Sequence, residues 1–186
     1  MLWKNGQGVT TELYCLESHG AMQFRISTAI VAQSGPFSDF TGYDRSIVNL
    51  GPGKMRLSTA GLEARTLGAL DIAHFDGGAA TDCEITEACR DLNIFCAKDQ
   101  YFASTISRTL TKPEFIPVPP TSSSFIYVIA GSMVVQNQDT REFFVQTGEA
   151  MLREASDSVN ADRWMLASAS DEACHYVLVV FRRLWL

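Results

Sequence analysis

Ile47-Val48-Asn49-Leu50-Gly51-Pro52-Gly53-Lys54-Met55 places a glycine-proline-glycine turn between two apolar segments. Glycine and proline are strong turn formers, and a short apolar segment on each side of a turn is typical of β-strands. A similar stretch, Ile126-Tyr127-Val128-Ile129-Ala130-Gly131-Ser132-Met133, follows later, with Gly131 lying 78 residues after Gly53. Because hairpins resemble one another for physical reasons, this repetition suggests two similar β-rich lobes but does not prove a duplication.

Short strand-like segments separated by turns make up most of the remaining chain, which predicts an all-β sandwich or barrel. Four of the six prolines lie between residues 113 and 120, and Thr-Ser-Ser-Ser follows at 121–124. Such a stretch cannot be a central strand, because proline lacks the amide hydrogen that a sheet requires. We therefore predict an N-terminal lobe over residues 1–112, a connection over 113–124 and a C-terminal lobe over 125–186.

Composition narrows the classes of partner. The 186 residues carry a net charge of −6, which disfavours a nucleic-acid-binding surface. The longest apolar runs have six residues, against roughly 20 for a membrane-spanning helix, so we expect no membrane partner. No secretory signal is visible, and the five cysteines form no Cys-x-x-Cys pair. We expect a cytoplasmic protein, for which a homodimer stays open.

Sequence signatures of metal or nucleophilic catalysis are missing. The three histidines, His19, His74 and His175, are more than fifty residues apart, so no metal-binding spacing occurs. Gly6-Gln7-Gly8 resembles the start of a dinucleotide-binding loop but has Thr11 in place of the third glycine. No Gly-x-Ser-x-Gly motif is present. We expect no metal and no cofactor, although three distant histidines can still converge by folding.

A set of polar residues, most of them near the N-terminus, predicts a binding site for a small organic anion. Arg25 and Ser27 share the polar face of an otherwise apolar strand, and Asn93 lies between two apolar residues. Arg45 precedes an apolar strand, where its guanidinium could hold a carboxylate through two hydrogen bonds; the alternative is a structural ion pair near Asp44. The predicted ligand-binding residues are Lys4, Asn5, Thr10, Arg25, Ser27, Arg45 and Asn93.

Four blocks of the chain resemble the HutD/Ves family. In chain order they are Trp3-Lys4-Asn5-Gly6-Gln7-Gly8-Val9-Thr10-Thr11-Glu12, Phe24-Arg25-Ile26-Ser27, Gly35-Pro36-Phe37-Ser38-Asp39-Phe40-Thr41-Gly42-Tyr43-Asp44-Arg45 and Arg90-Asp91-Leu92-Asn93-Ile94-Phe95. The third block is the most distinctive. The chain departs from the family where Thr11 replaces a frequent arginine, and where Phe95 and Ala97-Lys98 replace a methionine and an arginine pair.

The resemblance implies a bicupin fold, in which one chain forms two antiparallel, jelly-roll-like β-barrel lobes without the metal-binding histidines of catalytic cupins. Family members are associated with bacterial histidine utilisation, where sensing or limiting of formylglutamate or formiminoglutamate has been proposed, and others are linked only to stress response. The resemblance thus implies a metal-free protein that binds a carboxylate metabolite and acts as a regulator.

Two other functions stay open at this point. The first is a metal-independent isomerase or hydrolase, with Glu12 or Asp91 as general base and Lys4 or Arg45 holding the developing negative charge. The second is an interaction protein, for which the C-terminal Phe181-Arg182-Arg183-Leu184-Trp185-Leu186 is suggestive.

Overall fold

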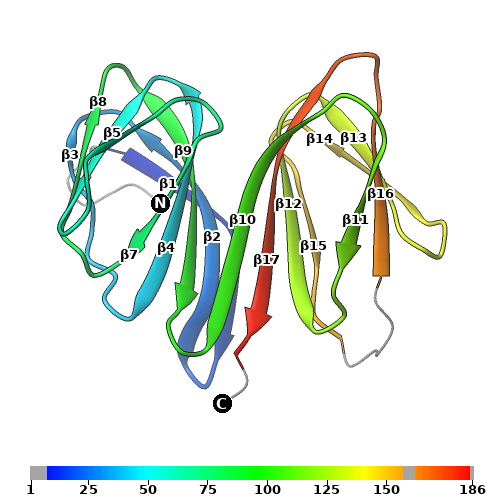
Figure 1. The fold of residues 1–186 in the computed structure, drawn as a ribbon, viewed down its shortest axis with the longest axis horizontal. Helices are drawn as coiled ribbons and strands as arrows, with labels where there is room; N and C mark the ends of the chain where they lie inside the picture. The colour runs from blue at the N-terminus through cyan, green and yellow to red at the C-terminus, as the bar shows by residue number, and fades with distance from the viewer. Residues whose placement is uncertain (1–7, 157–161, 185–186) are drawn as a thin grey trace. The chain divides into compact units, whose positions relative to one another are not determined.

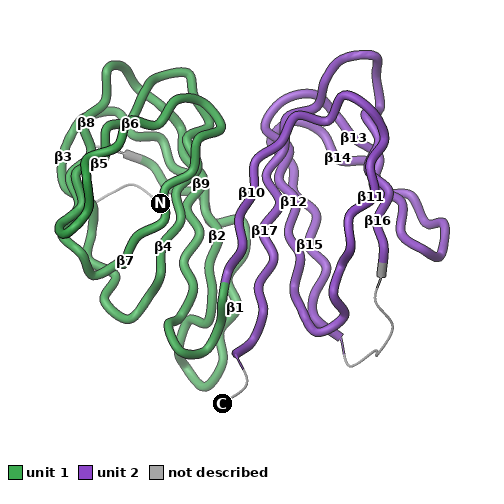
Figure 2. The backbone as a smooth tube through the Cα atoms, viewed as in Figure 1, with its two compact units in different colours: residues 1–102 green, residues 103–186 purple. Residues whose placement is uncertain are grey.

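The computed structural model describes residues 8–156 and 162–184, which form seventeen β-strands and no helix (Figure 1). The prediction of an all-β chain is confirmed. None of the described residues belongs to a helix long and apolar enough to cross a membrane. The chain divides into two compact units, residues 1–102 (unit 1) and residues 103–186 (unit 2) (Figure 2).

Unit 1 contains two antiparallel sheets that pack face to face. The first has the order β1-β2-β9-β4-β7, with β1 at Gly8–Ser18, β2 at Ala21–Val31, β9 at Cys89–Ala97, β4 at Tyr43–Pro52 and β7 at Ile72–Asp76. The second has the order β3-β8-β5-β6, with β3 at Gly35–Pro36, β8 at Thr81–Ile85, β5 at Met55–Thr59 and β6 at Arg65–Leu67. Val31 and Ile47 from the first sheet meet Leu57 and Cys83 from the second in one buried core.

Unit 2 also has two packed sheets. One has the order β10-β17-β12-β15, with β10 at Tyr101–Leu110, β17 at Cys174–Arg183, β12 at Ser122–Ala130 and β15 at Ala150–Arg153. The other has the order β11-β16-β13-β14, with β11 at Glu114–Val118, β16 at Asp162–Ser168, β13 at Ser132–Gln136 and β14 at Glu142–Gln146. Ile126 and Leu178 from one sheet pack in the same core as Trp164 and Leu166 from the other.

The two units repeat one topology. The orders β2-β9-β4-β7 and β3-β8-β5-β6 of unit 1 become β10-β17-β12-β15 and β11-β16-β13-β14 in unit 2, each strand number raised by eight. The register agrees as well, since the pairing of β4 with β9 shifts directly after Asn49 and that of β12 with β17 directly after Val128. The two similar sequence stretches therefore occupy equivalent places, β4–β5 and β12–β13.

The glycine-proline-glycine turn is a corner between sheets and not the tip of a hairpin. β4 pairs with β7 and β9, whereas β5 pairs with β6 and β8. The buried Asn49 side chain holds this corner: its Nδ2 donates to the carbonyl oxygens of Gly53 (2.8 Å) and Leu67 (3.0 Å), and its Oδ1 accepts from the Gly51 amide (2.8 Å). Gly51 has a φ of 78°, which favours glycine there.

The proline-rich segment, expected to connect two lobes, lies within unit 2. Part of it forms β11, which is the edge strand of its sheet and pairs only with β16. Pro117 stands opposite Arg163 in that pair. An edge position tolerates proline because one side of the strand needs no ladder hydrogen bonds, so the exclusion of residues 113–120 from a central strand is confirmed. For residues 122–124 the exclusion is wrong, because they begin β12, which pairs with β17 on one side and β15 on the other.

Candidate functional site

The register of β2, β9 and β4 brings four of the predicted residues together. Ser27 on β2 stands opposite Asn93 on β9, and both Arg25 and Arg45 stand opposite Phe95 from its two sides. Directly opposed residues of an antiparallel pair point to the same face of the sheet. That face packs against the second sheet of unit 1, so these side chains project into the interior of the unit.

Arg45 is a buried cation held by one amide and surrounded by aromatic rings. Its side chain is only 7% exposed, and its Nε and Nη2 donate to Oδ1 of Asn93 at 3.2 and 2.5 Å. The guanidinium lies over the rings of Phe37 (4.3 Å), Phe95 (5.1 Å) and Phe75 (5.5 Å). Burial lowers the pKa of Arg45 to about 10, which leaves the side chain charged at neutral pH.

Asp91 is the buried carboxyl of the same face. Its Oδ1 accepts from Nδ2 of Asn93 at 2.6 Å, and its Oδ2 is buried without a hydrogen-bond partner. Burial raises the pKa of Asp91 to about 7, against the opposing effect of the nearby Arg45 charge. Asn93 thus bridges the cation and the carboxyl. Arg45 makes its hydrogen bonds to Asn93 and not to Asp44, whose side chain lies on the opposite face of β4.

Arg25 and Ser27 add polar groups with unused hydrogen-bonding capacity. The Arg25 guanidinium lies 4.9 Å from the ring of Phe95 and 5.6 Å from that of Phe40, and its Nε is buried without a partner. Ser27 is 1% exposed and its Oγ also lacks a partner. A buried polar group without a partner costs free energy comparable to a lost hydrogen bond, so such groups on one face point to a polar ligand.

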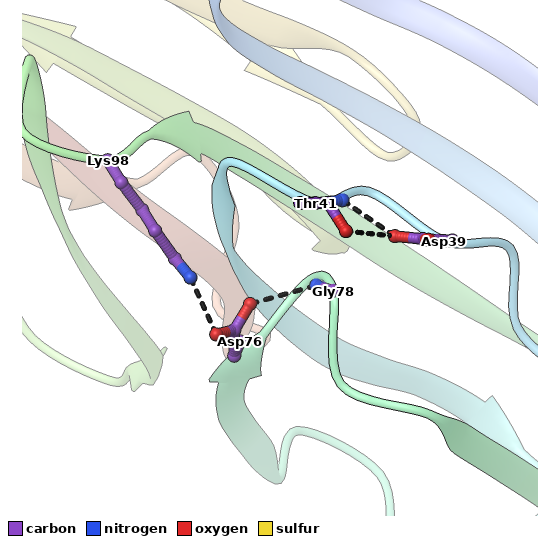
Figure 3. A network of polar contacts seen from close by, with 5 residues as sticks. All are labelled: Asp39, Thr41, Asp76, Gly78 and Lys98. Atoms are coloured by element: carbon purple, nitrogen blue, oxygen red, sulfur yellow. Dashed lines mark hydrogen bonds and ion pairs between the residues drawn. The ribbon is translucent and has the colours of Figure 1, made fainter.

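Backbone hydrogen bonds fasten the loop that carries Phe37 and Phe40 to the turn between β7 and β8, and Figure 3 shows the side-chain contacts within each of these two segments. Asp76 pairs with Lys98 at 2.6 Å and accepts from the Gly78 amide at 2.8 Å, while Asp39 closes its own turn through Thr41. The Phe40 amide donates to the carbonyl oxygen of Gly77 at 2.9 Å. The third sequence block therefore forms a braced loop that holds aromatic rings beside both arginines.

The charges of this interior do not balance at neutral pH. Burial raises the pKa of Cys83 to about 12 and that of Cys89 to about 11, so both thiols are neutral. Among the described residues, Arg45 is the cation that acts on the buried carboxyl of Asp91, and the raised pKa leaves this carboxyl only partly ionised at neutral pH. Within residues 8–156 and 162–184, no group of three or more histidine, cysteine, aspartate or glutamate side chains could hold a metal ion.

The other predicted residues have different placements. Lys4 and Asn5 lie outside the described residues. Thr10 is on β1, opposite Ala29, and is therefore separated from β9 by the whole of β2. Glu12, one of the two carboxylates considered as a base, is exposed and stands opposite Ser27.

Sequence reasoning overlooked the aromatic part of the site. Phe37 and Phe40 belong to the third block, and Phe95 is a departure from the family pattern, yet none was assigned a role. The sequence did contain an indication of this, because aromatic residues lie close to both arginines: Phe24 directly precedes Arg25, and Phe40 and Tyr43 shortly precede Arg45. Asp91 was considered only as a catalytic base.

Unit 2 has no equivalent of this site. Arg45 and its opposite residue Phe95 correspond to the opposed pair Ser124 and Val180 of unit 2. Asn93 and Asp91 correspond in the same register to Leu178 and Tyr176, and both of these pack in the apolar core. The arrangement of Arg45, Asn93 and Asp91 is therefore specific to unit 1 among the described residues, although Ser122 and Ser124 of unit 2 also have buried hydroxyls without a partner.

A family model described as HutD matches residues 1–171. The chain belongs to the HutD family. It is 38% identical over 106 residues to an uncharacterized 21.2 kDa protein in the hutC 3' region of Pseudomonas putida, a match that covers 55% of this chain and 56% of that relative. It is 31% identical over 102 residues to the protein Ves of Citrobacter koseri, covering 53% of each chain. The chain thus spans about half the length of the curated relatives it matches.

Solved structures share the fold of this HutD-family chain over nearly its whole length. A conserved protein of unknown function from Pseudomonas aeruginosa PAO1 has a TM-score of 0.89 at 25% identity, covering 98% of this chain and 93% of its own. HutD from Pseudomonas fluorescens SBW25 has a TM-score of 0.79 at 22% identity, with coverages of 100% and 94%. A cupin 2 conserved barrel domain protein from Leptotrichia buccalis has a TM-score of 0.61 at 13% identity, with coverages of 97% and 91%. The fold is therefore cupin-like.

Proposed function

We propose that unit 1 binds a small organic carboxylate on the inner face of its first sheet. The observation that carries this proposal is the unbalanced charge of the interior, where the buried cation Arg45 faces a carboxyl, Asp91, whose pKa is raised to about 7 by burial. Arg45 donates to Asn93 through Nε and Nη2, and the Oγ of Ser27 on the same face is buried without a partner. A carboxylate placed beside the Arg45 guanidinium and the Ser27 hydroxyl supplies a hydrogen-bond acceptor for both.

The biological role that fits this site is regulation or support of histidine utilisation in the cytoplasm. Membership of the HutD family and the relative in the hutC 3' region support it. The ligand is then a carboxylate such as formylglutamate or formiminoglutamate, and the repeated two-sheet topology is that of a metal-free bicupin with two barrel-like lobes. Lys4, Asn5 and Thr10 complete the proposed ligand set from the N-terminal segment.

Titration calorimetry tests this function with formylglutamate, formiminoglutamate, urocanate, glutamate and formate. Formate is the smallest carboxylate, and the HutD structure from P. fluorescens is of a formate condition. A charge-assisted hydrogen bond is worth roughly 1.5–3 kcal/mol, so Arg45→Met should weaken binding by about 10-fold to 150-fold. Arg56→Met is the matched control, because Arg56 is an exposed arginine of unit 1 paired with Glu84 at 3.3 Å.

Two results would contradict the proposal. Equal binding by the parent, Arg45→Met and Arg56→Met would place the ligand elsewhere, and absence of carboxylate binding at millimolar concentration would remove the function itself. Affinities are compared only between variants that unfold cooperatively. Arg45→Met meets this condition even if it unfolds at a lower temperature than the parent.

A second candidate function is a metal-independent isomerase or hydrolase. The observation that favours it is Asp91, because a buried carboxyl with a pKa of about 7 is suited to general base catalysis near neutral pH. Arg45 would then stabilise negative charge that develops on the substrate. Incubating each carboxylate with the protein and following it by proton NMR decides between the two. Turnover that Asp91→Asn abolishes supports an enzyme, whereas an unchanged ligand supports a binding protein.

A further inference from the structure

One carboxyl oxygen of Asp91 accepts a hydrogen bond, and the other has no hydrogen-bond partner. Oδ1 accepts from Asn93, and the nearby Ala29 backbone amide also favours the ionised form. Oδ2 is fully buried and has no partner, in the same interior as the Ser27 Oγ, which also has none. An oxygen in this situation is poorly placed as part of a carboxylate, because it is buried and has no hydrogen-bond donor among the described residues. It is well placed to carry a proton, provided that an acceptor comes to it.

The ligand proposed above brings such an acceptor and an additional negative charge. Because Arg45 is the one cation that acts on Asp91 among the described residues, a second carboxylate would place two negative charges beside one positive charge, and buried carboxyls in that situation share one proton. The groups that face Asp91 from the described elements are Arg45 on β4, Cys83 on β8 and Cys89 on its own strand. Arg25 on β2 acts on Arg45. Arg45 keeps its proton and both thiols are neutral, so Asp91 is the group that can change its charge.

We infer that Asp91 binds the ligand as a neutral carboxylic acid: as the carboxylate binds beside Arg45, one proton passes from solvent to Oδ2, and the new O–H donates to a ligand oxygen. This step rests on the proposed carboxylate binding. No covalent bond of the ligand changes. Asp91 is then a ligand-binding residue in addition to those assigned above, and the site selects ligands that accept a hydrogen bond at this point.

The charge balance sets the size of the effect. With a pKa of about 7 before binding, Asp91 is mostly ionised at pH 8 and mostly neutral at pH 6. Binding should therefore take up about one proton per ligand at pH 8 and close to none at pH 6, and the affinity should fall about tenfold per pH unit above about pH 7. A base catalyst would behave in the opposite way, since it must be ionised when the substrate is bound.

Sodium formate is the probe. It is titrated into the protein by calorimetry between pH 5.5 and 8.5 in buffers of different ionisation enthalpy. The dependence of the binding enthalpy on the buffer gives the number of protons taken up. The parent protein should show the uptake described above. Asp91→Asn should bind formate at pH 8 at least as tightly as the parent, without proton uptake and without pH dependence. The reason is that the Asn93 amide keeps the asparagine oxygen at the Oδ1 position and directs its NH2 group to the ligand. Asp82→Asn, an exposed change on the outer face of β8, is the control and should behave like the parent.

The outcomes separate the two proposals. Formate binding by the parent with no proton uptake at pH 8 overturns the role of Asp91 and leaves carboxylate binding intact. Loss of formate binding in a cooperatively folded Asp91→Asn also overturns it, because the ionised form would then be the one required. Absence of binding by the parent at every pH overturns both the proposed function and this inference.

Discussion

Replacing Asn93 by leucine should destabilise unit 1 strongly, although the two side chains have the same branched arrangement of heavy atoms. Leu178 occupies the equivalent position in unit 2, so the backbone of this fold accepts leucine there. What unit 1 would lose is the amide that accepts from Arg45 at 3.2 and 2.5 Å and donates to Asp91 at 2.6 Å. The change leaves a buried cation without a hydrogen-bond acceptor.

The expected cost follows from these contacts. Breaking a buried charged network by removing one partner costs about 3–5 kcal/mol. For a chain of this length, 1 kcal/mol corresponds to roughly 2–4 °C in the midpoint of thermal unfolding, so Asn93→Leu should lower that midpoint by roughly 6–20 °C. Asn137→Leu is the matched control, because Asn137 accepts from the Arg141 amide in an exposed turn and its loss should cost about 1 kcal/mol.

A double-mutant cycle with Arg45→Met isolates the interaction. If Asn93 chiefly satisfies Arg45, then Asn93→Leu should cost much less once the cation has been removed, with a coupling free energy of about 2–3 kcal/mol. Urea unfolding followed by circular dichroism measures all four proteins. Additive costs, with a coupling free energy below about 0.5 kcal/mol, would refute the claim that Asn93 is the partner that keeps Arg45 buried.

Three further predictions concern stability and the limits of the site. Folding raises the pKa of Asp91 from 3.8 to about 7, so the native state holds this proton more tightly than the unfolded state does. The contribution of Asp91 to the free energy of unfolding should therefore fall as pH rises from about 4 to about 7, and unfolding of Asp91→Asn and the parent over this range measures the difference. Gly77→Ala should destabilise unit 1 by about 1–3 kcal/mol, since its Cβ would lie 2.8 Å from the carbonyl oxygen of Tyr43 and 2.9 Å from that of Phe40, whereas Gly68→Ala meets only an ordinary 3.5 Å contact; equal urea midpoints would contradict this. Tyr176→Phe removes a hydrogen bond to a carboxylate of unit 2 and should cost about 1–3 kcal/mol without changing formate affinity, and an affinity change in calorimetry would mean that the site extends beyond unit 1.

Side-chain alternation and the position of proline within a few residues were enough to predict several strands and to predict which segment could not be a central strand. The alternation of apolar and polar residues predicted that residues 24–30 form a strand with Arg25 and Ser27 on one face. Strand β2 confirms this prediction. Proline chemistry kept residues 113–120 out of a central strand, and β11 is an edge strand. These predictions succeeded because side-chain period and the missing proline amide act within a few residues and need no knowledge of the partner strand.

Pairing between distant segments was decided only by the tertiary structure. The strands on either side of the Gly51-Pro52 turn enter different sheets, although the local pattern is that of a hairpin. Asn93 was predicted to be polar and strand-borne, but only the register of β9 against β4 places it beside Arg45, 48 residues earlier in the chain. The raised pKa of Asp91 depends in the same way on burial between two sheets. Strand partners and burial arise from packing of the whole unit, which a local pattern does not encode.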